Sequence, residues 1–179
     1  MSDHELLDML RDPLRRNAGI AHFIRQFQKP VYYYIRRMVL SHEDADDISQ
    51  VVFIKAWKAI DGFRGDAKLS TWLYRIAHNE CITFLRNAKR IMNVETHALE
   101  KSLGAALQSD VLFSGDEIQA RLQTAIALLP EKQKAVFIMR YYDELKYEEM
   151  SEITGTSVGA LKASYHHAVQ KIEAFLGGQ

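Results

Sequence analysis

Aromatic and basic side chains are interleaved in one short stretch of the chain, FRGDAKLSTWLYRIAHNE, which spans residues 63–80. Its aromatic residues and its bases are Phe63, Trp72, Tyr74, Arg64, Lys68, Arg75 and His78. Aromatic faces can stack on unpaired bases while cations hold phosphates, so this composition is typical of a site for single-stranded nucleic acid. The alternative is that Phe63 and Trp72 belong to a core and that the charges only solvate a helix. For Trp72 taken alone, we favour burial.

A second candidate element lies near the C-terminus, in the stretch YEEMSEITGTSVGALK over residues 147–162. Four apolar residues recur there at the spacing of a shared interior: Met150, Ile153, Val158 and Leu161. Gly155 supplies a tight turn between two helices, and the pattern is typical of a helix-turn-helix, whose second helix enters the major groove of DNA. On spacing alone, an ordinary helical hairpin fits equally well.

The second helix of this pair is expected to expose a neutral, small-residue face. Its outward residues are Ala160, Lys162, Ala163, His166, His167 and Gln170. Small side chains would let the backbone approach DNA, Lys162 could reach a phosphate or a guanine, and the imidazoles could donate or accept hydrogen bonds. Because this face offers no arginine for the commonest base contact, we expect the element to bind DNA weakly by itself.

Helices must position both elements, because apolar residues recur at spacings of three and four and no alternating run indicates a hairpin. Over residues 20–40 they form one stripe, in which Pro30 is expected to kink or divide the helix. Ser41 is placed to cap the next helix. Ser70 or Thr71 is placed to cap the helix after it, beyond a glycine-containing turn.

The helical pattern loosens over residues 93–116, where Gly, Ser and acidic residues are scattered, and we expect a linker there. Helical order returns beyond it, with Pro130 in the first turn of a helix. The sequence therefore predicts an all-α protein of two small helical domains, residues 1–92 and 117–179. The second is expected to be a four-helix domain that contains the helix-turn-helix.

Charge is unevenly distributed along a chain of 179 residues whose formal net charge is zero. Residues 53–90 carry eight bases and three acids, a net +5. They lie between residues 41–52, with four acids and no base, and residues 91–119, with five acids and one base. A zero net charge argues against a generic nucleic-acid binder, but the basic block leaves a local site possible.

Several classes of function are disfavoured by composition. Cys81 is the single cysteine, which rules out an intramolecular disulfide and fits the cytoplasm, and no apolar run is long enough to insert into a membrane. Cys81 with His78, or His166 beside His167, lacks the spacing of a metal or acid-base site. We therefore expect no catalytic residue, no metal and no cofactor, and do not expect an enzyme.

Four ordered blocks of the sequence resemble the extracytoplasmic-function sigma factors, the small specificity subunits of bacterial RNA polymerase. The blocks are DADDISQVVFIKAW (44–57), FRGDAKLSTWLYRIAHNE (63–80), LLPEKQKAVFIMRYY (128–142) and KYEEMSEITGTSVGALK (146–162). They cover both expected domains, in the family's order and at its spacing. The resemblance implies a dissociable factor that binds core polymerase and directs promoter recognition and transcription initiation.

The resemblance also implies roles for the first domain. The polymerase-binding block, which in the family docks on the beta-prime clamp helices, would contain Asp47, Ile48, Gln50, Val51, Phe53 and Trp57. The segment that recognises and opens the minus-ten promoter element would contain Phe63, Arg64, Lys68, Tyr74, Arg75, Asn79 and Arg86. Capture of an extruded base costs a few kcal/mol, which stacking and amide hydrogen bonds would have to offset.

The second domain would, by the same resemblance, read the minus-thirty-five element and meet the polymerase beta flap. The residues expected at that DNA are Ser157, Ala160, Lys162, Ser164, His166 and His167. The chain departs from the family's usual form here, since it has ALKAS after Gly159 where many members have Thr-Val-Lys-Ser-Arg. This departure leaves the promoter sequence open. The resemblance further implies an anti-sigma factor as a partner.

Two other functions compete with this interpretation. A helix-turn-helix transcription regulator would need an upstream ligand or phosphoacceptor domain, for which residues 1–92 show no α/β pattern. A helical adaptor that binds only protein would not need the aromatic and basic loop. Both would act without binding core polymerase, and a steep salt dependence of DNA affinity would separate the adaptor from a DNA-binding factor.

Overall fold

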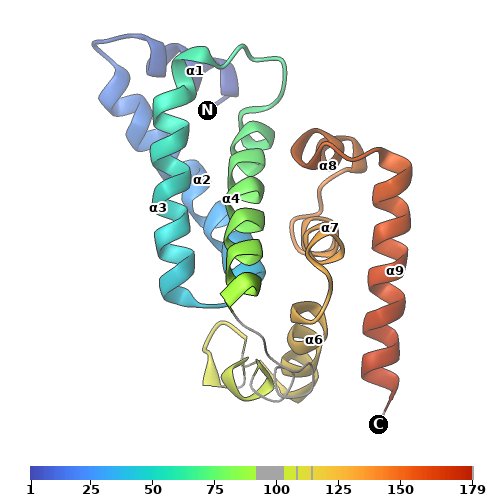
Figure 1. Ribbon diagram of the computed structural model, residues 1–179. Helices are drawn as coiled ribbons and strands as arrows, with labels where there is room; N and C mark the ends of the chain where they lie inside the picture. Colours follow the sequence, from blue (N-terminus) through green and yellow to red (C-terminus); the bar gives the residue numbers. More distant parts are fainter. Residues whose placement is uncertain (92–102, 108, 114, 179) are drawn as a thin grey trace. The chain divides into compact units, whose positions relative to one another are not determined.

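The computed structural model describes residues 1–91, 103–107, 109–113 and 115–178 (Figure 1). Over these residues the chain is helical and contains no strand, so the prediction of an all-α fold is confirmed. Two compact units are present, the first mainly Met1–Cys81 and the second mainly Ile82–Ser151 with Thr156–Gln179. Most of the linker expected at 93–116 lies outside the described residues, and its boundaries stay a prediction.

The first unit is built on a long central helix. The N-terminal elements are α1 (Asp3–Arg11), α2 (Arg16–Val39), α3 (His42–Ala59), the short 3-10 helix η1 (Ile60–Gly62) and α4 (Leu69–Ile91). Helix α2 packs against both α1 and α3. Its stripe of apolar residues is buried as expected, and Pro30 lies inside the helix without dividing it. This helix therefore forms the shared wall of the unit's core.

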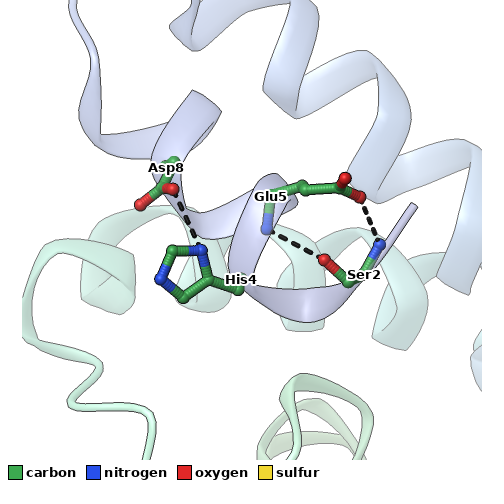
Figure 2. Close-up of polar contacts among 4 residues, drawn as sticks. All are labelled: Ser2, His4, Glu5 and Asp8. Atoms are coloured by element: carbon green, nitrogen blue, oxygen red, sulfur yellow. Dashed lines mark hydrogen bonds and ion pairs between the residues drawn. The ribbon is translucent and has the colours of Figure 1, made fainter.

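Helix α1 has a fully formed N-terminal cap (Figure 2). The Glu5 backbone N–H donates to the Ser2 hydroxyl oxygen at 3.2 Å, and the Ser2 N–H donates to Glu5 Oε2 at 2.8 Å. This reciprocal pair is a capping box, and the hydrogen bond from the Ser2 backbone holds the pKa of the Glu5 carboxyl below its usual range. In the same helix, His4 Nδ1 lies 3.0 Å from Oδ2 of Asp8, one turn further along the chain.

The N-termini of α3 and α4 can be compared with the predicted capping residues. Ser41 caps α3, accepting the Asp44 N–H at 3.3 Å, as expected. Helix α4 begins at Leu69, so the expectation of a cap at Ser70 or Thr71 was wrong. Its first N–H donates instead to the Asp3 carboxylate of α1 at 2.8 Å. The helix starts earlier than its own sequence suggests because a distant residue satisfies its exposed donor.

Polar and aromatic contacts in the core join α4 to α2. The ring of Tyr34 is 0% exposed, and its hydroxyl lies 3.0 Å from His78 Nδ1. Tyr34 also packs on Tyr74 with 5.5 Å between ring centroids, and the Tyr74 hydroxyl donates to the Pro30 carbonyl at 3.3 Å. On the other side, Lys55 of α3 pairs with Glu80 of α4. These contacts set the rotation of α4 about its axis.

The second group of helices comprises α6 (Glu117–Ala127), α7 (Glu131–Tyr141), α8 (Tyr147–Thr154) and α9 (Val158–Gly177). The side chain of Asp116 caps α6, and Pro130 stands at the N-cap of α7, one residue before the first-turn position predicted for it. Helix α9 packs against α6 and α7. The prediction of a four-helix group at the C-terminus is confirmed over the described residues.

Within the part of the chain that the structure describes, no helix has the length and apolar character required to span a bilayer.

Replacing Tyr34 should separate the contributions of its hydroxyl and its ring. We expect Tyr34→Phe to lower the free energy of unfolding by about 1 kcal/mol through the lost hydrogen bond. Tyr34→Ala should lower it by about 3–5 kcal/mol, because a cavity is added to the lost contacts. Urea unfolding followed by circular dichroism measures both values, and equal losses would contradict the assignment of a separate role to the hydroxyl.

Candidate protein and nucleic-acid interfaces

The exposed face of α3 carries acidic and apolar residues side by side. Of the set predicted to bind protein, Asp47, Gln50, Val51 and Trp57 are exposed. Ile48 is buried and faces the core, whereas Phe53 is partly exposed.

Ile54 was missed by the sequence reasoning although it is 53% exposed. It lies three residues from both Val51 and Trp57 and so shares their face of the helix. The three form an apolar stripe on α3, called here the α3 stripe. The sequence signal for it was present, since three apolar residues at a spacing of three did not fit the buried set.

A hollow between α2 and α3 runs beside the α3 stripe. One part, of about 360 Å³, is lined by apolar residues that include Ile20, Phe23, Ile54 and Trp57. A more polar part, of about 510 Å³, is lined by residues that include Lys29, Tyr32, Asp46 and Gln50. Ile24 and Phe53 line both parts, so the two are neighbours.

Trp57 is held in place from α2 at the edge of this hollow. The Arg16 guanidinium lies 4.2 Å from the centre of the Trp57 ring, and its Nη2 bonds Asp61 Oδ2 at 3.1 Å. A cation over an aromatic face is attractive at this distance. The arrangement therefore presents the indole ring at one orientation.

The predicted nucleic-acid segment comprises a short loop and the start of α4. Residues 63–68 link η1 to α4, and Gly65 has φ +83°, a conformation that favours glycine. Arg64 and Lys68 in the loop are exposed. Arg75 and Asn79 on α4 are exposed too, and their spacing of four residues puts them on one face of the helix. Arg86, two turns further on, is also exposed.

Two aromatic residues of the predicted DNA-binding set are buried. Phe63 is 8% exposed and packs on Trp72 with 5.1 Å between ring centroids, while Tyr74 is 6% exposed. In this structure their rings belong to the core and are not presented for stacking on a base. Trp72, for which burial was favoured, is partly exposed and shares the face of Arg75 and Asn79. The helical periodicity of the sequence did not distinguish the buried rings from the exposed one, because Phe63 lies in a loop that packs it against Trp72 of α4.

The C-terminal helix pair has the expected turn and the expected outward face. Gly155 has φ +71°, and Ser157 caps α9 by accepting the Ala160 N–H at 3.2 Å. The outward residues are exposed as predicted: Ala160, Lys162, Ala163, His166, His167 and Gln170. Ser164 is partly exposed. The Ser157 hydroxyl is thus engaged in the helix cap.

A cluster of cations and aromatic rings next to α9 was not predicted. The centre of the Tyr147 ring lies 4.8 Å from the Arg140 guanidinium and 5.7 Å from Lys162 Nζ. Burial, with Tyr147 nearby, raises the pKa of the Tyr165 hydroxyl, so this side chain stays neutral at physiological pH. Tyr147 restricts the orientation of Lys162, the basic side chain predicted to meet DNA.

Two family models match the chain, one over each group of helices. Sigma-70 region 2 matches residues 23–91, and Sigma-70, region 4 matches residues 119–172.

Relatives with established names match over most of the chain. The ECF RNA polymerase sigma factor SigW of Bacillus subtilis (strain 168) is 32% identical over 159 residues, which cover 83% of each chain. The RNA polymerase sigma factor YlaC of the same strain is 28% identical, over 87% of this chain and 90% of its own length. The ECF RNA polymerase sigma-E factor of Escherichia coli (strain K12) is 32% identical, over 83% and 81%.

Solved structures with the same fold include two complexes. The sigma factor RpoE, bound to the anti-sigma factor NepR from Bartonella quintana, matches with a TM-score of 0.70 and 19% identity, over 88% of this chain and 96% of its own. CnrH, bound to the cytosolic domain of CnrY, matches with a TM-score of 0.72 and 20% identity, over 99% and 98%.

Proposed function

The chain belongs to the extracytoplasmic-function sigma factors of the sigma-70 family, which direct RNA polymerase to promoters, and we propose how its exposed surfaces divide that task. The surface on α3 would bind core polymerase, the loop at residues 63–68 with α4 would open the minus-ten element, and α9 would read the minus-thirty-five element. The observation that carries the assignment is that these surfaces, distinct in chemistry, fall within the two matched regions.

The α3 stripe and the acidic residues beside it suit a basic helical partner with an apolar centre, here the beta-prime clamp helices. Exposed apolar side chains at the middle of an interface carry most of the binding energy, while charges at its rim guide encounter. Val51, Ile54 and Trp57 would be the anchors, with Asp47 and Gln50 at the rim. Ile48, which is buried, would hold α3 against the core, and Phe53 would line the hollow beside the anchors.

Truncating an anchor on α3 should weaken polymerase binding without unfolding the chain. We expect Ile54→Ala to lower the affinity for core polymerase roughly tenfold, since the side chain is exposed and its loss should cost little folding stability. Leu14→Ala, at a residue that is 95% exposed outside this surface, is the matched control and should bind normally. Biolayer interferometry with core polymerase measures both, and normal affinity of Ile54→Ala would argue against the anchor.

The loop and the outward face of α4 would bind the nontemplate strand of the minus-ten element. Arg64, Lys68, Arg75 and Arg86 would hold phosphates, and Asn79 would donate to a base. Trp72 is the ring on this face that could stack on an unpaired base, because stacking needs an accessible aromatic surface. Phe63 and Tyr74, which are buried, would instead hold the loop and the helix in place.

Removing two side chains from the face of α4 should impair promoter opening alone. We expect Arg75→Ala with Asn79→Ala to slow formation of the open complex by roughly 10- to 100-fold, with unchanged affinity for core polymerase. The double variant Arg25→Ala with Gln26→Ala, an exposed arginine and an exposed amide residue on α2, is the control. Permanganate reactivity of unpaired thymines reports opening, and an unaltered rate would refute this role of the α4 face.

Helix α9 would read the minus-thirty-five element with a weak surface that depends on tethering to polymerase. Lys162 would supply the main charged contact, with Ser164, His166 and His167 along the same face and Ala160 allowing close approach. Tethering raises the effective concentration of DNA near the helix, so a low intrinsic affinity is sufficient. Ser157 would act through its cap on the helix N-terminus, and this region would also meet the beta flap.

The charge of Lys162 and its orientation should be separable by salt titration. We expect Lys162→Met to weaken holoenzyme binding to a minus-thirty-five duplex severalfold, and to reduce the slope of log affinity against log salt by about one. Tyr147→Leu should weaken binding with an unchanged slope, because the charge remains while its orientation is lost. Lys171→Met, exposed further along α9, is the control, and equal slopes for all variants would contradict a Lys162–phosphate contact.

Regulation by an anti-sigma factor and action in the cytoplasm are part of the same proposal. Two structures of the same fold are complexes with an anti-sigma factor or with a cytosolic partner domain, which supports a partner of this kind here. The predicted division into residues 1–92 and 117–179, joined by a linker, would let such a partner cover surfaces of both domains.

A further inference from the structure

Helix α1 contacts both ends of the loop over residues 63–68. The Arg11 guanidinium Nη2 donates to the Phe63 carbonyl oxygen at 2.6 Å, where the loop begins. The Leu69 N–H donates to the Asp3 carboxylate Oδ2 at 2.8 Å, where the loop ends. Both hydrogen bonds are partly buried and involve a charged group, so they are of the stronger kind. Helix α1 precedes residues 23–91, the segment that matches Sigma-70 region 2.

The helix that makes these contacts is itself firmly placed. Leu6, Leu7 and Leu10 of α1 are buried, and the capping box at its N-terminus fixes its first turn. On its α2 side, a Cβ added at Gly19 would lie 3.1 Å from the Leu10 backbone N and the Met9 backbone C. The backbones of the two helices therefore approach as closely as a glycine allows, and α1 is a rigid support.

The two anchored positions are immediate neighbours of the two loop cations. Arg64 follows the carbonyl that Arg11 holds, and Lys68 precedes the N–H that Asp3 holds. Gly65 gives the intervening backbone a left-handed turn that costs conformational freedom to order. Fixing both ends in the free protein removes part of the ordering cost that DNA binding would otherwise bear.

We propose that α1 is a brace for promoter opening, in which Arg11 and Asp3 are positioning residues that hold the loop at residues 63–68 ready for the displaced strand. The proposal rests on the proposed role of this loop and of α4 at the minus-ten element. Neither residue is assigned a contact with DNA. The brace would act on the step at which the strand is captured and not on polymerase binding.

The test compares the rate of open-complex formation for variants of the full chain. Each variant is present at a concentration that saturates core polymerase, so differences in polymerase binding do not affect the rate. We expect Arg11→Ala and Asp3→Ala each to slow opening roughly tenfold, the effect of losing one strong hydrogen bond at a positioned site. Asp3→Asn keeps an oxygen that accepts the Leu69 N–H, and Arg11→Lys keeps a cationic donor. Both conservative variants should recover most of the rate. Recovery in Asp3→Asn, which removes the charge but keeps the acceptor, is the result that a role in net charge alone would not produce.

Two controls separate the brace from general stability. Asp8→Ala changes an acidic residue of α1 whose side chain bonds His4, and it should open promoters normally. Ser2→Ala removes the hydroxyl that caps α1 but leaves the Arg11 and Asp3 side chains. It should lower the melting temperature while the opening rate stays close to that of the unsubstituted protein. If opening falls with melting temperature across all variants alike, the brace is overturned.

The double variant Arg64→Ala with Lys68→Ala, which removes both loop cations, distinguishes failure of the brace from failure of the loop's proposed function. Slow opening in that variant, with normal opening in Arg11→Ala and Asp3→Ala, would overturn the brace and leave the loop's role standing. Normal opening in all of them would overturn both. Failure of Asp3→Asn to recover the rate would also overturn the brace, because the acceptor oxygen would then be irrelevant.

Discussion

The buried contact between Tyr34 and α4 is the constraint on which the first unit depends. A hydroxyl with no exposure must find a partner inside the protein, and His78 provides it at 3.0 Å. Since Tyr74 on the same helix bonds the Pro30 carbonyl, α4 is fixed to α2 at two points one turn apart. The rotation that satisfies these groups turns Arg75 and Asn79 outward. Buried contacts therefore determine the orientation of the α4 face that is proposed to bind DNA.

The roles proposed for the three surfaces follow from the distribution of charged residues along the chain. A chain of zero net charge cannot rely on a uniform basic field, so it concentrates cations on a loop and one helix face and leaves α3 acidic and apolar. On α9, which has no arginine, the cation near the start of the helix is Lys162, held against the Tyr147 ring. A chain without a uniform basic field gains little from the nonspecific electrostatic attraction to DNA.

Local sequence signals predicted most of the fold and part of the candidate site. The cap at Ser41, the turn at Gly155 and the outward face of α9 depend on residues within a few positions, and all were found. The start of α4 at Leu69 was not predictable, because Asp3 supplies the missing acceptor from far along the chain.

The aromatic residues were the hardest to assign. Phe63 was expected at the surface and is buried, while Trp72 was expected to be buried and is partly exposed. Both rings suit either environment, and the fold of a loop decides between them. The position of the Tyr147 ring near two cations was not predicted either, because Arg140 and Lys162 belong to different helices. Gly19 also limits which side chains this position accepts. A larger residue there would force α1 back by a few tenths of an ångström, so the absence of a side chain sets how closely the N-terminal helix docks on α2.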